Sequence, residues 1–107
     1  MVDKKSQSYH RLERIVKGFA NHRRIEVLAL LKNEPELSVD EIARRLRINF
    51  KTASEHIRRM AIAGLLLKRS DGSHIRHKLT GTGASILKFL RMLEWLNSNM
   101  IKAIIFD

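Results

Sequence analysis

Two short helical patterns joined by a brief connection, between Ser38 and Gly64, constrain the fold of this chain more than any other feature. Ser38 and Glu41 have the spacing of a capping box, which marks the start of a helix. That helix is expected to have an apolar side and an outward basic side, formed by Ile42, Ala43 and Leu46 and by Arg44, Arg45 and Arg47. The segment 47–49 is then expected to turn tightly into a second helix.

The second helix is expected to run from Phe50 to about Ala63, with Asn49 as N-cap and Gly64 as a left-handed C-terminal residue. Its apolar face is narrow and consists of Ala53, Ile57, Met60 and Ala61. The opposite face is polar and basic and carries Lys51, Thr52, Ser54, Glu55, Arg58 and Arg59. Such a helix buries one stripe and leaves its polar side available to a partner.

A β-hairpin is expected directly after this pair of helices. Its strands are predicted at Leu65–Arg69 and His74–Leu79, and the residues between them contain Asp71-Gly72, a pair typical of tight hairpin turns. Because an isolated hairpin is only marginally stable, we expect it to pack on the helices through the apolar side of its first strand.

Two helices are expected before this unit. The first, Ser8–Phe19, has an apolar stripe that can serve as core or as a dimer contact, formed by Leu12, Ile15, Val16 and Phe19. The second runs from His22 to about Lys32 after the N-cap Asn21, and its wide apolar stripe suits packing against two neighbours. Residues 1–8 are expected to fray.

The last helix is too apolar for one packed face. The segment 80–83 breaks the chain and can cap a helix from Ala84 to about Met100, and the apolar character continues to Phe106. A helix that is apolar nearly all round is buried on more than one side, and the simplest second neighbour is another subunit. We therefore expect residues 84–107 to form a dimerisation helix in a homodimer. The predicted dimerisation residues are Leu12, Ile15, Phe19, Leu90, Leu93, Trp95 and Met100.

The charge distribution points to a polyanionic partner. The 107 residues form a chain of single-domain length with a net charge of +10. Residues 41–80 alone hold ten Lys or Arg against three Asp or Glu, so the charge is concentrated on the helix pair and the hairpin. A concentrated basic patch attracts phosphate backbones.

Other bulk properties limit the class of protein. The chain has no cysteine, which removes disulfides, thiolate metal sites and cysteine nucleophiles. No apolar run approaches the roughly 20 residues needed to span a bilayer, and no secretory signal is recognisable. We expect a cytoplasmic, prokaryotic-type, nucleoid-associated protein with no membrane partner.

Helix, tight turn, helix and hairpin make up a mainly α winged helix-turn-helix, with four helices, two strands and a fifth helix. In that fold the second helix of the pair, here 50–63, enters the major groove, and the wing, here 68–78, lies on backbone or minor groove. We therefore predict a sequence-specific regulator of transcription that binds double-stranded DNA, most simply a dimeric repressor. The predicted DNA-binding residues are Arg44, Arg45, Asn49, Lys51, Thr52, Ser54, Glu55, Arg58, Arg59, Lys68, Arg69, Arg76 and Lys78.

Within this set, Lys51, Thr52, Ser54 and Glu55 are expected to read bases, and the arginines and the wing to bind backbone. Two alternatives stay open at this stage. Glu55 either accepts a hydrogen bond from cytosine or holds the neighbouring arginines through i+3 and i+4 pairs. Residues 76–78, which include His77, are either phosphate contacts or ordinary surface.

The run from Phe19 to Thr80 resembles the ArsR-type winged-helix family of small dimeric repressors. The matching segments are FANHRRIEVLALLKNEPELSVDEIARRL, INFKTASEHIRRMAIAGLL and KRSDGSHIRHKLT. Parts of this pattern, including L-S-V-x-E-I-A and the closing L-T, are shared with MarR-like families. The resemblance implies a symmetric dimer, formed by the first and last helices, on a pseudo-palindromic operator.

The chain departs from that family in its metal ligands and at Phe50. Many members sense metal through a cysteine pair or through His and acidic ligands on the last helix, and this chain has neither, so no metal site is expected. His74 and His77 are three apart on a strand and point to opposite faces, which is poor chelating geometry. Phe50 stands where a small polar residue is usual, and it either touches a thymine methyl or packs under the turn.

No catalytic set is recognisable, because the chain has neither a nucleophile elbow nor paired carboxylates, and we expect neither an enzyme nor a cofactor. Two other functions remain as alternatives. The first is a non-specific architectural DNA-binding protein. The second is a winged helix that serves as a protein-interaction module.

Overall fold

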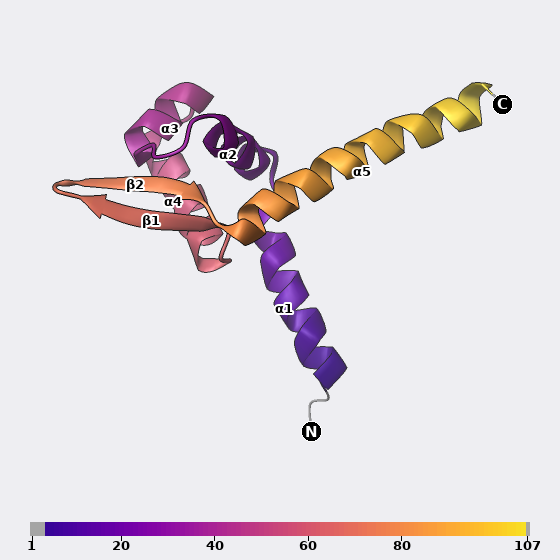
Figure 1. Ribbon diagram of the computed structural model, residues 1–107, viewed down its shortest axis with the longest axis horizontal. Helices are drawn as coiled ribbons and strands as arrows, with labels where there is room; N and C mark the ends of the chain where they lie inside the picture. The colour runs from indigo at the N-terminus through magenta and orange to yellow at the C-terminus, as the bar shows by residue number, and fades with distance from the viewer. Residues whose placement is uncertain (1–3, 107) are drawn as a thin grey trace.

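The computed structural model describes residues 4–106, which form five helices and one two-stranded antiparallel sheet (Figure 1). In chain order these are α1 (Lys4–Phe19), α2 (His22–Asn33), α3 (Val39–Leu46), α4 (Phe50–Ile62), β1 (Leu66–Asp71), β2 (His74–Leu79) and α5 (Gly81–Phe106). The predicted mainly helical winged helix-turn-helix fold is confirmed. Residues 1–3 and 107, which include part of the segment expected to fray, lie outside the described residues.

The core lies where α2, α3 and α4 meet the base of the hairpin and the start of α5. Its fully buried members are mostly the apolar positions predicted from helical spacing, and they include Val27, Leu28, Leu31, Ile42, Ile57, Met60 and Leu65. Each such side chain contributes roughly 1.5–3 kcal/mol through removal from water. This core holds α3 and α4 in a fixed relation to each other.

Local caps start three of the helices, as their sequences predict. The Asn21 carboxamide oxygen accepts hydrogen bonds from the amides of Arg23 and Arg24 at 2.9 and 3.3 Å. The capping box of α3 is complete, because the Ser38 hydroxyl and the Glu41 amide are 3.2 Å apart and the Glu41 carboxylate accepts from the Ser38 amide.

The tight connection between α3 and α4 depends on Arg47, which has a left-handed backbone with φ 56°. The amide of Ile48 then bonds to the Ala43 carbonyl at 3.0 Å, which closes the end of α3. The Asn49 side chain accepts from the Thr52 amide at 3.1 Å and starts α4. A left-handed conformation disfavours a residue with a Cβ by roughly 1–2 kcal/mol, and the caps on both sides offset it.

The first strand of the hairpin ends later than predicted, whereas the second has its predicted bounds. Strand β1 begins at Leu66 and continues to Asp71, which pairs with His74. Only Gly72 and Ser73 therefore lie between the strands, instead of the four residues 70–73. The reason is conformational: Gly72 has φ 62°, and a tight hairpin loop of this length readily takes glycine at its first position.

The hairpin is attached to the helices mainly through β2. Of β1 only Leu66 is buried, so the expected apolar side is short. His77 of β2 forms an extra bridge with Leu37 in the connection between α2 and α3. The amide of His77 bonds to the Leu37 carbonyl at 2.9 Å, and the Glu36 amide bonds to the His77 carbonyl at 2.9 Å.

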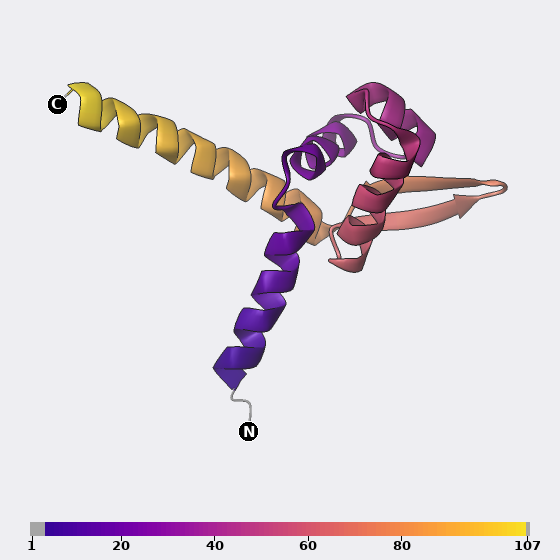
Figure 2. The same ribbon diagram turned by 180° about the vertical axis from the view of Figure 1, so that it is seen from behind.

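Both terminal helices are longer than their sequences predicted, and they extend from the core as two separate arms (Figures 1 and 2). Helix α1 starts at Lys4 instead of Ser8. Helix α5 starts at Gly81 instead of Ala84 because the Thr80 hydroxyl accepts from the Gly83 amide at 2.9 Å, which places both glycines inside the first turn. Among residues 4–106, no helix is both long and apolar enough to cross a bilayer.

Candidate nucleic-acid interface

The polar face of α4 is open to solvent on the side away from the core. Lys51, Thr52, Glu55 and both arginines of the helix are exposed, and Ser54 is half-buried. The apolar stripe on the other side, with Ala53, Ile57 and Met60, is fully enclosed. The packing of that stripe fixes which side chains α4 presents.

Glu55 lies at the centre of this face and binds two arginines. Its carboxylate accepts hydrogen bonds from Arg58 at 3.1 and 2.8 Å and from Arg59 at 2.8 Å. The hydrogen bonds from Arg58 and then Arg59 lower the pKa of Glu55 to about 2. In the unbound chain Glu55 therefore holds these arginines, which is one of the two roles that its sequence left open.

The arginines of α3 are also paired in the unbound chain. Arg44 pairs with Asp40 one turn earlier, and Arg45 pairs with Glu34 at 3.1 Å. Both side chains remain exposed, as their outward positions predicted. Exposed ion pairs of this kind are worth only about 0–1 kcal/mol, so a phosphate can compete for the arginines at small cost.

Two further arginines join the wing to the connection between α2 and α3. Arg69 of β1 bonds to the Glu36 carboxylate at 2.9 and 3.1 Å. Arg76 of β2 bonds to Asp71 at 3.0 Å and to the Glu36 carbonyl at 3.1 Å. These arginines hold the wing in position as well as contributing positive charge.

Three lysines of the predicted interface have no ion-pair partner among residues 4–106. They are Lys51 at the start of α4, Lys68 of β1 and Lys78 of β2, and all three are exposed. A lysine without a carboxylate partner loses no intramolecular pair when it binds a phosphate. The wing and the start of α4 therefore carry the most readily available cations of the predicted set.

The structure shows the exposure of two residues, Phe50 and His77, for which the sequence left two roles open. Phe50 is 58% exposed at the first turn of α4, so it does not pack under the turn. His77, considered as surface or phosphate contact, is instead 1% exposed, which corrects that expectation. Its Nδ1 atom lies 2.9 Å from the Leu37 carbonyl oxygen, and burial lowers the pKa of its imidazole.

The predicted dimerisation residues fall into three groups by exposure. Leu12 on α1 and Leu93, Trp95 and Met100 on α5 are exposed. Ile15 and Leu90 are half-buried, and Phe19 belongs to the core of its own chain with 9% exposure. Little of Phe19 is left for a partner to cover, because it packs into the same core as α2.

Sequence reasoning missed several residues that shape this surface. Glu36 has φ 70° and joins the wing to the helices, and no local pattern indicated that role. Arg24 lies between α1 and α4 and bonds to His56 at 3.0 Å, although the run His22-Arg23-Arg24 was a visible basic signal.

Within the described part of the chain, no three His, Asp or Glu side chains lie close enough together to hold a metal ion.

A helix-turn-helix with an attached wing defines the class of this domain. The sequence model of the MarR family matches residues 20–77, which is more than half of the chain. The chain therefore belongs to the MarR family.

Similar proteins support the same class. Over 79 residues the chain is 30% identical to the HTH-type transcriptional regulator Rv0324 of Mycobacterium tuberculosis, covering 74% of this chain and 34% of that protein. Over 68 residues it is 31% identical to the transcriptional activator HlyU of Vibrio cholerae, covering 64% of this chain and 62% of HlyU. The chain thus spans between one third and two thirds of the length of these two relatives.

A solved structure extends the likeness to the whole fold. The homodimeric winged helix-turn-helix DNA-binding domain of Mb0332 from Mycobacterium bovis, a possible ArsR-family regulator, has a TM-score of 0.78 and 25% identity. The match covers 88% of this chain and 87% of that domain. The predicted resemblance to ArsR-type and MarR-like winged-helix regulators is confirmed.

Proposed function

We propose that this chain is a transcriptional regulator that binds specific sites on double-stranded DNA as a homodimer. The observation that carries the proposal is the exposed polar face of α4, which is fixed by its buried stripe and flanked by a wing with free lysines. Helix α4 has the dimensions to enter the major groove, where each base pair displays a distinct edge. Rv0324, HlyU and Mb0332 are all named or described as transcriptional regulators or activators.

The roles of the site residues follow from position. Lys51, Thr52 and Ser54 lie in the first turns of α4 and are proposed to contact base edges. Arg58 and Arg59 lie deeper in the helix and are proposed to bind phosphate together with the wing lysines. Asn49 acts first as the N-cap that starts the helix.

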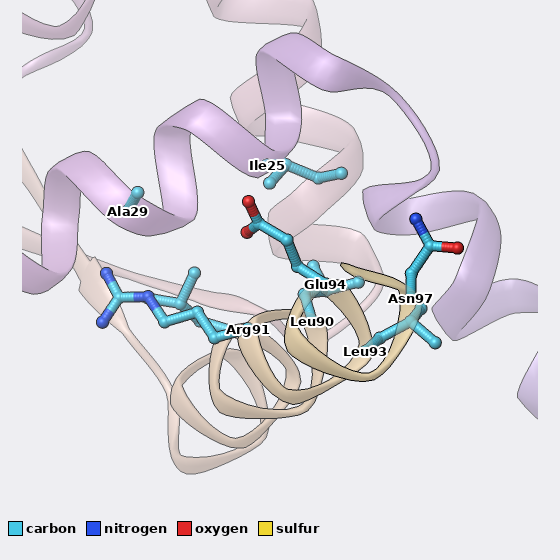
Figure 3. A pocket seen from close by; sticks show the side chains of 8 residues that line it. Ile25, Ala29, Leu90, Arg91, Leu93, Glu94 and Asn97 are labelled. Atoms are coloured by element: carbon cyan, nitrogen blue, oxygen red, sulfur yellow. The ribbon is translucent and has the colours of Figure 1, made fainter. Parts of the chain in front are cut away.

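The homodimer is proposed from apolar surface that the described chain leaves uncovered. Tyr9, Leu12 and Val16 of α1 are exposed, as is a long series on α5 that includes Met92, Trp95, Met100, Ile104 and Ile105. A groove of about 610 Å³ between α2 and α5 adds to this surface, with Ile25 and Ala29 of α2 facing Leu90 and Leu93 of α5 (Figure 3). Monomers rarely expose so much contiguous apolar area.

The test is duplex binding measured by fluorescence anisotropy, with a site obtained by selection from random DNA. The double variant Lys51→Ala/Arg58→Ala is expected to weaken binding at least tenfold and to reduce its salt dependence. A matched double variant, Lys32→Ala/Lys88→Ala, removes two exposed cations from the end of α2 and the start of α5. If both variants bind as the wild type does, the proposed interface is wrong.

The same experiment separates the two alternatives. A non-specific architectural protein would bind the selected site and random DNA equally. A protein-interaction module would bind neither at physiological salt. The sign of regulation is a separate measurement: we predict repression, whereas HlyU is named an activator, and a reporter gene behind the selected site distinguishes the two. A cytoplasmic, nucleoid-associated location without catalysis, metal or cofactor belongs to the same proposal.

A further inference from the structure

A basic pocket lies beside the C-terminal half of α4, and three of its cations, Arg14, Lys17 and Arg24, are outside the predicted interface. A pocket of about 260 Å³ opens between α1, α2 and α4, and five cationic side chains line it: Arg14, Lys17, Arg24, Arg58 and Arg59. Gly18 and Ala63, which also line the pocket, bring the end of α1 close to the end of α4, because a Cβ added at Gly18 would collide with the Ala63 side chain. Three segments that are distant in sequence thus contribute charge to one place.

The charges in this pocket are only partly compensated. Lys17 pairs with Glu13 at 2.7 Å, and Arg58 and Arg59 share the single carboxylate of Glu55. Five cations therefore face two carboxylates. Among residues 4–106, no ion pair involves Arg14 or Arg24.

Arg24 lines the pocket and is held in place by two hydrogen bonds. Its Nε donates to His56 Nδ1 at 3.0 Å, and its Nη1 donates to the Lys17 carbonyl at 2.8 Å. Partial burial, and then the charge of Arg59, lowers the pKa of Arg24. A cation that is fixed and partly desolvated beside another cation is stabilised by an incoming anion, and a preorganised guanidinium loses little entropy on binding it.

The size and position of the pocket indicate the ligand. Its volume is below the roughly 300–1,000 Å³ of pockets for drug-sized ligands and leaves room for a phosphate group. Arg58 and Arg59 belong both to this pocket and to the exposed face of α4, so the pocket is continuous with the proposed DNA surface. Guanidinium groups bind phosphate oxygens through paired hydrogen bonds.

We infer that this pocket binds one phosphate of the DNA backbone, beside the groove that α4 enters, with Arg14 and Arg24 as contacts that extend the interface onto α1 and α2. The inference rests on the proposed function. Such a contact adds affinity for every duplex and carries no sequence information by itself.

The test is the slope of log affinity against log salt concentration. Each neutralised phosphate contributes about 0.9 to this slope, so the double variant Arg14→Gln/Arg24→Gln is expected to lower it by about 2 for a dimer with two pockets. Affinity should fall by a similar factor on the selected site and on random DNA. The matched control Lys32→Gln/Lys88→Gln removes the same charge elsewhere and is expected to leave the slope unchanged.

Further variants and probes keep the inference falsifiable. Arg14→Gln alone removes an exposed side chain that makes no side-chain hydrogen bond or ion pair among residues 4–106, so it tests the pocket even if loss of Arg24 disturbs the fold. Inorganic phosphate is added without DNA at constant ionic strength, and the melting temperature is recorded. A saturable rise that Arg14→Gln/Arg24→Gln abolishes, together with an unchanged DNA slope, would assign the pocket to a free anion and overturn the inference.

Failure of this inference can be distinguished from failure of the proposed function. If the wild type binds duplex DNA and the pocket variants keep its slope, the inference alone is wrong. Equal losses in the pocket variant and in the control would reduce the effect to overall charge and would also overturn it. If the wild type binds no duplex, both the inference and the proposed function are wrong.

Discussion

The imidazole of His77 lies 2.9 Å from the carbonyl oxygen of Leu37, at the point where the hairpin meets the connection between α2 and α3. The backbones of the two residues are also paired. The wing is therefore attached to the helices by hydrogen bonds of both the backbone and the imidazole ring of His77. The position of the wing on the helices therefore depends on a buried histidine as well as on the arginine contacts with Glu36 and the apolar residues at the base of the hairpin.

Stability is expected to fall on acidification because of this histidine. Burial lowers the pKa of His77 below its usual 6.5; the hydrogen bond to the Leu37 backbone opposes this shift in part, and the nearby Lys68 adds to it. The folded state then binds the proton less tightly than the unfolded state, so the stabilising contribution is complete above about pH 6.5 and is lost as pH falls through the folded pKa. Urea unfolding at pH 8 and pH 5.5 measures the difference.

The variant His77→Asn keeps a hydrogen-bond donor close to the Nδ1 position but cannot titrate. Between pH 8 and pH 5.5 the free energy of unfolding is expected to fall less in this variant than in the wild type. Poorer packing of the asparagine lowers its stability at both pH values. His56, whose pKa is also lowered by burial, accounts for part of the remaining dependence. Equal pH dependence in the wild type and in His77→Asn would contradict the assignment.

Replacing Glu55 distinguishes its two possible roles in DNA binding. If Glu55 only holds Arg58 and Arg59, Glu55→Gln releases both guanidinium groups and removes a negative charge, so duplex affinity should rise severalfold and its salt dependence should steepen. Glu26→Gln, which releases Arg23 on α2, is the matched control. A tenfold loss of affinity confined to the selected site would instead show that Glu55 reads a base.

The first turn of α5 contains a matched pair of glycines. A Cβ added at Gly83 would lie 2.2 Å from the Leu65 carbonyl oxygen, whereas one added at Gly81 would meet no atom within 4 Å. Because the backbone at Leu65 must move to make room for this Cβ, Gly83→Ala is expected to cost about 1–3 kcal/mol of unfolding free energy. Gly81→Ala should stay within about 0.5 kcal/mol of the wild type or be slightly stabilising. Equal stabilities in chemical denaturation would refute the close approach.

The apolar arm of α5 should control association. Trp95 is 62% exposed in the single chain, and Trp95→Glu is expected to weaken the homodimer by at least tenfold, about 1.4 kcal/mol. Sedimentation velocity across micromolar concentrations measures this. Lys88→Glu also introduces a carboxylate on an exposed position of α5 and should leave association unchanged. A wild type that sediments as a monomer would refute the proposed dimer.

Much of the fold could be predicted because the deciding interactions are local. The caps Asn21, Ser38 and Asn49 bond to amides two or three residues away, so their spacing in the sequence is sufficient. The hairpin was less well predicted, because β1 continues two residues beyond the predicted end at Arg69 and the connection shortens from residues 70–73 to Gly72-Ser73. How far two strands pair depends on their register and on contacts with the rest of the fold, which no short motif contains.

The candidate site divides in the same way. The identity of its residues and the concentration of charge over residues 41–80 follow from the sequence alone, because helical periodicity determines which side chains share a face. Whether those side chains are free of ion-pair partners does not follow from the sequence. Arg69 bonds to Glu36 across 33 residues, and His77 bonds to Leu37 across 40.

The sequence by itself determined the class of fold, the polar face of α4 and the excess of apolar surface on α5, since each depends on near neighbours in the chain. Only the tertiary structure decided which arginines are held by carboxylates, which histidine is buried and how Arg14, Arg24 and Arg59 come together in one pocket. Those relations depend on the distance between segments that meet only after the core has formed.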